Sequence, residues 1–373
     1  MSNKYVFKAH NLLLIAVVVL LNFIGILILN SASNMDASIV SRQVMGSVIG
    51  FIGCMAVMFI DYNRLAKHSK LIYGAVIAIL LAVLLLGAAH KGAGRWIVLP
   101  LIGQIQPAEF AKVGFILFFA DFLNKNKESI NEFRTLLIAG TLFAIPAVLI
   151  FAEPNLSTTL IFCFIFVLMV VTSGLNMRLV IAALLIAGIA VALIMFLFTT
   201  DNYHLIPFIK EYQKNRILGF LYPEQYSDTF FQQKNSIMAI GSGGFFGKGL
   251  NNTDISSVKA GNFLIEEDTD FIFAIIGEEL GFRGCLGILG LYMLLICLIL
   301  WIAIKSRNLT GQAVCAGVAA WIGFQTFTNI AVATAIFPNT GVTLPFISRG
   351  ASSLLALYAG IGLVLNIGLQ TKD

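Results

Sequence analysis

Long apolar segments follow one another along almost the whole chain, and they constrain its fold more than any other feature. A helix needs about 20 mostly apolar residues to cross a bilayer. Ten such segments are present, near residues 12–31, 43–61, 71–89, 105–123, 135–152, 155–173, 178–199, 271–304, 311–337 and 351–370. We therefore predict an all-α integral membrane protein, a single bundle of about ten transmembrane helices that forms one domain over residues 1–373.

Composition supports this prediction and excludes other classes. The chain is 58% hydrophobic and 12% charged, whereas soluble domains are roughly 45–50% apolar and about 25% charged. Polar side chains could not cover a soluble fold of this length. The composition therefore argues against a soluble enzyme, a disordered chain and a nucleic-acid-binding protein.

Basic residues are distributed unevenly among the loops, and this predicts the orientation. One set of short loops and termini carries most of them, whereas the opposite short loops carry only Arg42, Lys91, Arg95 and Arg349. Short loops rich in Lys and Arg stay in the cytoplasm, so both termini are predicted to be cytoplasmic. The same count places one long segment, about 200–270, outside the cell as a large extracellular loop.

Charged residues gather toward the outer end of the predicted bundle. Arg95 lies in the segment 92–97 after the third apolar run, and Glu109 and Lys112 lie at the start of the fourth. A charge within a span is energetically costly and marks a functional site by default. Glu109 and Lys112 are three residues apart, share a helix face and can pair. Two interpretations stay open here, a structural ion pair between helices or a charged cavity for a polar or anionic ligand.

A glycine-rich segment at 240–250 invites comparison with a phosphate-binding loop. A Walker A loop would need glycine at 242 and Ser or Thr at 249, but the chain has Ser242 and Gly249. The segment also lacks a preceding strand and falls outside the cell in the predicted topology. We interpret it as a glycine-rich turn that shapes the outer loop.

Four carboxylates directly precede the eighth apolar segment: Glu266, Glu267, Asp268 and Asp270. Mutual repulsion and partial burial both raise a carboxylate pKa, which is the direction that a general base needs. Asp270, at the boundary with the apolar helix, is the best-placed candidate. The alternative is a solvated acidic helix start that interacts favourably with the helix dipole.

Two further features concern the last third of the chain. Glu279 and Arg283 are four residues apart and are predicted to form a structural ion pair. Pro345 and Gly350 indicate irregular backbone at membrane depth, which is tolerated where it lines a cavity.

Together these motifs resemble the SEDS family (shape, elongation, division and sporulation), which contains the FtsW, RodA and SpoVE proteins. The last motif is closer to FtsW and SpoVE than to RodA. The matching segments follow the family's order, at residues 92–97, 106–112, 153–158, 240–250, 268–282 and 339–353.

The resemblance implies a peptidoglycan glycosyltransferase that polymerises lipid II, the undecaprenyl-pyrophosphate-linked disaccharide-pentapeptide, into glycan strands for cell division or shape. It implies a class B penicillin-binding protein transpeptidase and other divisome or elongasome proteins as partners. Asp270 matches the family's essential aspartate and is the expected catalytic residue. A divalent cation, Mg²⁺ or Mn²⁺, held by the acidic segment is a further option. The residues expected to bind substrate are Lys112, Arg95, Glu109, Glu266, Arg349 and Ser352.

The chain departs from the family's motifs at positions close to these candidates. The family commonly has His-Thr-Asp where this chain has Asp268-Thr269-Asp270, and tyrosine where it has Arg349. A buried arginine in place of tyrosine requires a compensating acid, and we expect Glu153 or Glu267 to supply it.

Two other functions stay open. A flippase for lipid-linked precursors needs polar groups along the full membrane depth, but here they gather at the outer end apart from Asp121. A catalytically weakened scaffold for a class B penicillin-binding protein is motivated by Arg349, Ala351 and the missing histidine.

Overall fold

Helices make up almost all of the regular structure. The computed structural model describes residues 7–33, 35–86, 88–90, 93–99, 103–153, 155–200, 202–203, 211–252, 257–259, 261 and 263–371. The helices in these ranges are α1 (Ala9–Ala32), α2 (Ala37–Met58), α3 (Tyr62–Lys67), α4 (Ser69–Leu86), α5 (Pro107–Lys125), α6 (Phe133–Ala152), α7 (Leu156–Thr172), α8 (Met177–Thr199), α9 (Glu211–Leu221), α10 (Ser227–Ser242), α11 (Ile272–Lys305), α12 (Leu309–Ala333) and α13 (Ala351–Leu369). Each of the ten apolar segments found in the sequence coincides with one long helix.

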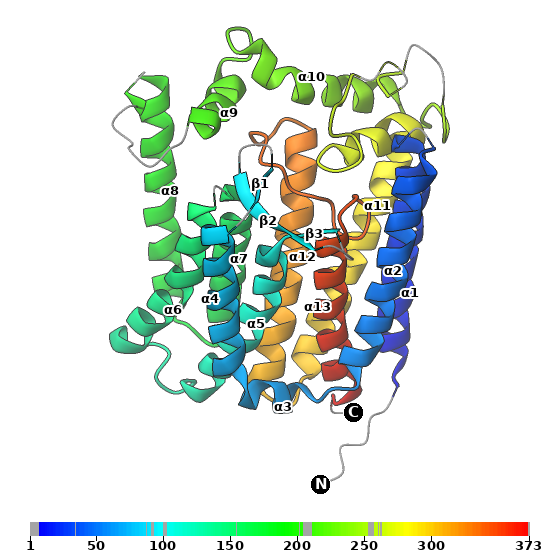
Figure 1. Cartoon of the computed structure of the whole chain (residues 1–373). Helices are drawn as coiled ribbons and strands as arrows, with labels where there is room; N and C mark the ends of the chain where they lie inside the picture. Colours follow the sequence, from blue (N-terminus) through cyan, green and yellow to red (C-terminus); the bar gives the residue numbers. More distant parts are fainter. Residues whose placement is uncertain are drawn as a thin grey trace.

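The long helices pack side by side in a bundle (Figure 1). Seven of those described are long and apolar enough to cross a membrane, namely α1, α2, α6, α8, α11, α12 and α13. The helices α4 and α7 are apolar but shorter, and α5 carries Glu109, Lys112 and Asp121 within its length. The chain is therefore a multi-pass membrane protein.

Burial differs strongly between the helices. α12 and α13 are buried on almost every side, and the most extensive packing in the molecule joins α13 to α2. α8 buries very few of its residues and stands at the edge of the bundle (Figure 1). The centre of the bundle therefore consists of the helices that flank the irregular segment 334–350.

The start of α1 and the end of α13 lie at the same end of the bundle. Lys8 Nζ, just before α1, donates a hydrogen bond to Thr371 O after α13, at 3.3 Å. At the same end, the backbone N–H of Tyr62 in α3 donates to Asn366 Oδ1 of α13 at 2.9 Å. The helices α9 and α10 lie across the opposite end (Figure 1).

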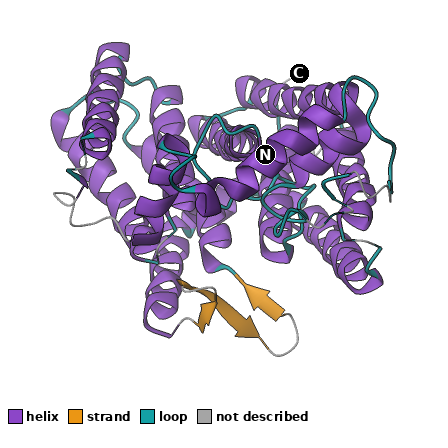
Figure 2. Ribbon diagram, turned by 90° about the horizontal axis from the view of Figure 1, so that it is seen from above, coloured by secondary structure: helices purple, strands orange, loops and turns teal. Residues whose placement is uncertain are grey.

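A small sheet corrects the prediction of an all-α fold. The strands β1 (Ala88–His90), β2 (Ala93–Leu99) and β3 (Gly103–Ile105) form a three-stranded antiparallel sheet at the periphery of the bundle (Figure 2). Glycines between α4 and α5 disfavour continuation of a helix, and the β-branched pair Ile97 and Val98 favours a strand. The sequence motif at 92–97 indicates only a loop here.

α11 is interrupted near its start, and the glycine-rich segment packs on the interruption. Gly281 has φ of +67° and ψ of −167° inside the helix. The carbonyls of Glu278 and Glu279 instead accept hydrogen bonds from the backbone N–H groups of Lys248 and Gly249, both at 2.9 Å. Residues 243–250, directly after α10, thus form a turn that packs the long α8–α11 connection against α11, in agreement with the interpretation of this segment as a shaping turn.

Candidate functional site

Asp270 lies directly before α11 and against the irregular segment 334–350. Its Oδ2 atom is 3.3 Å from the position that a Cβ atom on Gly341 would occupy. Gly341 has φ of +72°, a conformation that glycine adopts without strain. A side chain at this position would strain the backbone and crowd the carboxylate, so glycine keeps one side of Asp270 open.

Arg216 brings a guanidinium group to the same place. Its Nη1 atom lies 3.9 Å from the Cβ position of Gly341 and donates a hydrogen bond to Asn339 O at 3.1 Å. Arg216 belongs to α9, more than a hundred residues from Asn339 in sequence. No local pattern in the sequence distinguishes Arg216 from the other basic residues of the long connection, so its place in the site is not predictable from spacing.

Two amides on one face of α12 connect the parts of the site. Asn329 Nδ2 donates to Asp270 O at 2.9 Å and to Val342 O at 2.7 Å. Gln325, one turn earlier, donates from Nε2 to Thr343 O at 3.0 Å. Buried amides in an otherwise apolar span are costly unless they are hydrogen-bonded. This cost is the signal that could have identified both residues from the sequence.

Lys112 and Glu109 form a fully internal ion pair. Lys112 Nζ lies 2.9 Å from Glu109 Oε1, and the lysine side chain is 0% exposed. The same nitrogen lies 3.3 Å from Gln325 Oε1 and 4.5 Å from the centre of the Trp321 ring. The structural ion pair, one of the two open interpretations, is therefore present. The ammonium has no exposed surface on which a pyrophosphate could bind in this arrangement.

Ser352 is hydrogen-bonded to the residue that precedes α5, the helix that carries this ion pair. Its Oγ accepts a hydrogen bond from the backbone N–H of Gln106, just before α5, at 3.1 Å. Its neighbour Ser353 accepts through Oγ from Thr343 Oγ1 at 3.4 Å. Both serines therefore connect α13 to elements that surround Asp270 and Lys112.

The four carboxylates before α11 have different surroundings. Glu266 Oε2 accepts a hydrogen bond from Thr269 Oγ1 at 3.0 Å, whereas Asp268 interacts with Arg349 and Asp270 faces Gly341. The described part of the chain contains no group of three His, Cys, Asp or Glu side chains placed to hold a metal ion. Binding of Mg²⁺ or Mn²⁺ by the acidic segment stays a prediction.

Arg349 corrects a second expectation. It is not buried and its acid is neither Glu153 nor Glu267: its side chain is 45% exposed, and Nη1 lies 2.7 Å from Asp268 Oδ2. Its backbone N–H also donates to Asp268 O at 2.9 Å. Asp268 and Arg349 are two of the positions where the chain departs from the SEDS motifs. Each departure therefore compensates the charge of the other.

The segment that contains Arg349 crosses the interior of the bundle without regular structure, as Pro345 and Gly350 indicated. Its carbonyl groups at positions 345, 346 and 348 are hydrogen-bonded by side chains from three different helices. The donors are Tyr292 of α11 to Pro345 O, Asn22 of α1 to Phe346 O at 3.3 Å and Gln43 of α2 to Ser348 O at 3.2 Å. Such pairing satisfies irregular backbone at membrane depth.

A second charged cluster lies beside the break in α11. Glu278 and Glu279 are each 1% exposed, and they pair with Lys248 at 2.7 Å and Lys259 at 2.9 Å, respectively. The predicted pair between Glu279 and Arg283 is therefore wrong. Because α11 is broken at Gly281, residues four apart across the break do not share a regular helix face.

Glu267 faces this second cluster, which predicts a pH dependence of stability. Burial, with a smaller contribution from Asp268, raises its pKa from 4.5 to about 7. The pKa of Glu267 is higher in the folded than in the unfolded state, so the folded protein binds this proton more tightly. The stabilisation that this proton contributes to folding is complete below about pH 4.5 and is lost as pH rises through about 7. We expect the thermal midpoint in detergent to be several degrees lower at about pH 8 than at about pH 5. Glu267→Gln should remove most of this difference, and an unchanged slope in that variant would contradict the assignment.

One expected site residue cannot be placed as a side chain. The backbone of Arg95 lies in β2, but its side chain is outside the part of the protein that the structure describes. Its expected role in binding substrate stays a prediction.

The fold and the site together define a multi-pass membrane protein with a polar, charged site at one end of its helix bundle. A family model described as cell cycle protein, covering FtsW, RodA and SpoVE, matches residues 7–373. The chain therefore belongs to the FtsW/RodA/SpoVE family, which confirms the resemblance.

Individual relatives match over almost their full length. A protein named probable peptidoglycan glycosyltransferase FtsW from Geobacter sp. (strain M18) is 29% identical over 381 residues, with 98% of both chains covered. Peptidoglycan glycosyltransferase MrdB from Escherichia coli (strain K12) is 32% identical over 349 residues, which cover 93% of this chain and 90% of MrdB. Relatives named FtsW and MrdB are thus similar to this chain to nearly the same degree.

Solved structures share the fold. A chain from a peptidoglycan synthase complex that coordinates polymerization and crosslinking matches with a TM-score of 0.80 at 28% identity, covering 97% of this chain and 98% of that one. The rod shape determining protein RodA of Thermus thermophilus matches with a TM-score of 0.71 at 28% identity, covering 96% and 97%.

Proposed function

We propose that this protein is a peptidoglycan glycosyltransferase that polymerises lipid II at the outer face of the bacterial cytoplasmic membrane, for cell division or shape. The observation that carries the proposal is the placement of Asp270 against the open face of Gly341, beside Arg216, at one end of a membrane bundle. Relatives named for the same activity support it over nearly the whole chain.

We also propose a topology with ten crossings, both termini in the cytoplasm and one domain over residues 1–373. The pairing of Lys8 with Thr371 O supports an even number of crossings. Arg64 and Lys67 in the last turn of α3 lie at this same end, which supports its assignment to the cytoplasm. The segment 200–270 with α9 and α10 is then the extracellular loop.

In the proposed reaction, Asp270 accepts the proton of the 4-hydroxyl group on the acceptor GlcNAc. That oxygen forms a bond to the anomeric carbon of the donor MurNAc as the bond to undecaprenyl pyrophosphate breaks, and the leaving group carries away the electron pair. General-base catalysis of this kind contributes about 10²–10⁴-fold to a rate. Direct displacement inverts the anomeric configuration.

Cations are required because negative charge develops on the leaving pyrophosphate. We propose Arg216 for this role because its Nη1 atom and Asp270 Oδ2 both lie within 4 Å of the Cβ position of Gly341, whereas Arg349 is paired with Asp268 at the exposed edge of the site. Arg95 stays a further candidate. Lys112 and Glu109 then act by positioning Gln325, and Glu266 and Ser352 hold the flanking segments.

We propose a class B penicillin-binding protein as the transpeptidase partner, together with other divisome or elongasome proteins. The structural match to a chain of a peptidoglycan synthase complex supports a partner that crosslinks the polymer.

The direct test is polymerisation of purified lipid II by the full-length protein, alone and with its cognate transpeptidase. Glycan strands longer than the disaccharide unit are the expected product. Translocation of lipid II without any polymer would support a flippase instead, and absence of both activities would support a scaffold.

The Asp268–Arg349 pair gives a prediction for this assay. Arg349→Asp places two carboxylates together, displaces the turn before Asp270 and is expected to lower kcat at least tenfold. The exchange Asp268→Arg/Arg349→Asp restores the attraction and should recover most of the rate. An exchange variant as slow as Arg349→Asp would show that the guanidinium acts on substrate directly and not by positioning Asp270.

A further inference from the structure

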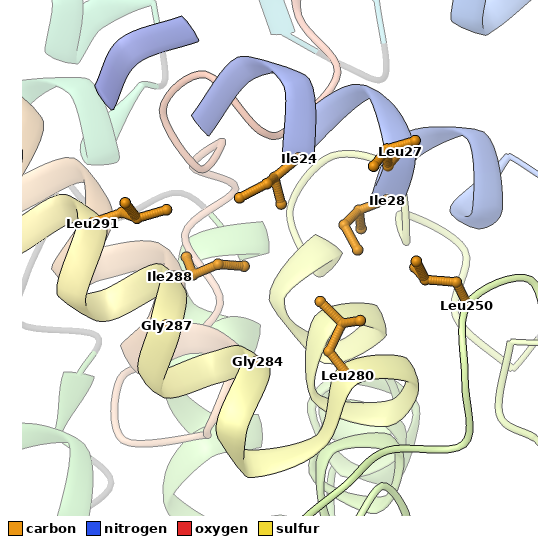
Figure 3. A pocket seen from close by; sticks show the side chains of 9 residues that line it. All are labelled: Ile24, Leu27, Ile28, Leu250, Leu280, Gly284, Gly287, Ile288 and Leu291. Atoms are coloured by element: carbon orange, nitrogen blue, oxygen red, sulfur yellow. The ribbon is translucent and has the colours of Figure 1, made fainter. Parts of the chain in front are cut away.

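An apolar groove separates α1 from α11 on the side of the bundle away from α8. Its volume is about 490 Å³, and every residue that lines it is apolar or glycine. Figure 3 shows Ile24, Leu27 and Ile28 of α1 facing Leu280, Ile288 and Leu291 of α11, with Leu250 of the glycine-rich turn at one end. Gly284 and Gly287 of α11 form its floor.

The size of the groove selects a single flexible chain as its occupant. One turn of an α-helix, about 10 Å wide and 5.4 Å long, occupies roughly 400 Å³, so the groove has room for little more than one turn of a partner helix. A methylene group is about as large as a water molecule, roughly 30 Å³, so the groove of about 490 Å³ holds roughly 16 of them. This is the length of one fatty acyl chain, whereas a polyprenyl chain of the undecaprenyl kind is several times longer.

A cation lies next to the lining of the groove, near the end of the groove where α11 begins. Arg283 is exposed and immediately precedes Gly284 of the groove floor. Its guanidinium lies 5.3 Å from the centre of the Phe246 ring, and no carboxylate within the described ranges pairs with it. The neighbouring lysine of the turn, Lys248, is already paired with Glu278.

Exposed aromatic rings surround this cation. Phe245, Phe246 and Phe282 are all more than half exposed, and Phe245 contacts both of the others, with ring centres 5.0 and 6.0 Å apart. Aromatic side chains with a basic residue beside them are typical of the membrane–water interface. The groove therefore runs from an interfacial cation into the apolar depth of the bundle.

We propose that this groove is a binding site for an anionic glycerophospholipid, with one acyl chain between α1 and α11 and the phosphate at Arg283. Moving an acyl chain from the surrounding lipid into the groove gains little free energy, because both environments are apolar. The charge of Arg283 therefore provides the selectivity for an anionic headgroup, and the shape of the groove fixes where the acyl chain lies. One basic residue near an anionic headgroup corresponds to about a fivefold preference.

The test uses the full-length protein in detergent and native mass spectrometry with phosphatidylglycerol or phosphatidylcholine as the probe. The wild type should bind one phosphatidylglycerol about fivefold more tightly than phosphatidylcholine. Gly287→Phe should weaken phosphatidylglycerol binding at least tenfold, because a Cβ atom there meets no atom within 4 Å and the ring fills the groove. Gly290→Phe is the matched control, since its Cβ position is equally open but lies outside the groove lining.

A second variant separates the charge from the shape. Arg283→Gln should abolish the preference for phosphatidylglycerol while phosphatidylcholine binding stays unchanged. The site would be overturned if Gly287→Phe kept the thermal midpoint of the wild type and also bound phosphatidylglycerol with the same affinity as the wild type. Displacement of phosphatidylglycerol by an equal amount of undecaprenyl phosphate would overturn the assignment to a glycerophospholipid.

Discussion

Replacing Asp270 by asparagine is expected to lower the rate of lipid II polymerisation by at least about 100-fold. The substitution keeps the shape of the side chain and removes the only feature that the proposed base requires, a carboxylate able to accept a proton. The hydrogen bond from Asn329 to the backbone carbonyl of Asp270 does not involve the side chain, so the fold should survive. The measurement is the initial rate of glycan formation by full-length protein with its transpeptidase.

Two comparisons make this result specific to Asp270. Asp228→Asn removes an exposed carboxylate from α10, in the same long connection, and should leave the rate unchanged. The thermal midpoint of Asp270→Asn should equal that of the wild type. A variant that is stable and retains full polymerisation would rule out Asp270 as the base.

Loss of the buried ion pair is expected to give the largest change in stability. Lys112→Met leaves the Glu109 carboxylate inside the bundle, 7% exposed, without the ammonium 2.9 Å away. Removing one partner of a buried pair destabilises a protein by about 3–5 kcal/mol. We expect a correspondingly large fall in the thermal midpoint in detergent.

The same helix supplies the control for this prediction. Lys125 pairs with Asp121 at 2.6 Å, but the Lys125 side chain is 58% exposed, so Lys125→Met should change stability by less than about 1 kcal/mol. Neutralising both partners with Glu109→Gln/Lys112→Met should recover most of the stability lost in Lys112→Met. A double variant as unstable as the single one would mean that the lysine stabilises the bundle through Trp321 or Gln325 and not through charge.

The SEDS resemblance and the residues that carry it were evident in the sequence, because charged and glycine-rich motifs stand out in an apolar chain. The sequence also indicated that Glu109 and Lys112 pair, since three residues in a helix bring side chains together by local geometry alone. The same local rule failed for Glu279 and Arg283, because Gly281 breaks the helix between them. A rule of helical spacing holds only where the backbone is helical.

Long-range contacts were beyond local rules. Arg216 reaches Asn339 from another element, and Asp268 pairs with Arg349 across about 80 residues of sequence. Glu267, one of the two residues expected to compensate Arg349, instead meets the second charged cluster. Each of these partners depends on how α9, α11 and the segment 334–350 pack together, which no spacing in the sequence specifies.

The sequence by itself determined the solvent, the positions of the long helices and the residues that make one end of the bundle chemically unusual. These properties follow from composition and from the length of apolar segments, because a bilayer requires continuous apolar helices. Only the tertiary structure decided which charges distant in sequence meet. The pairing of Lys259 with Glu279 and of Arg349 with Asp268, and the enclosure of Lys112, arise from contacts between distant elements, since burial of a charge is tolerated only where packing brings its partner to it.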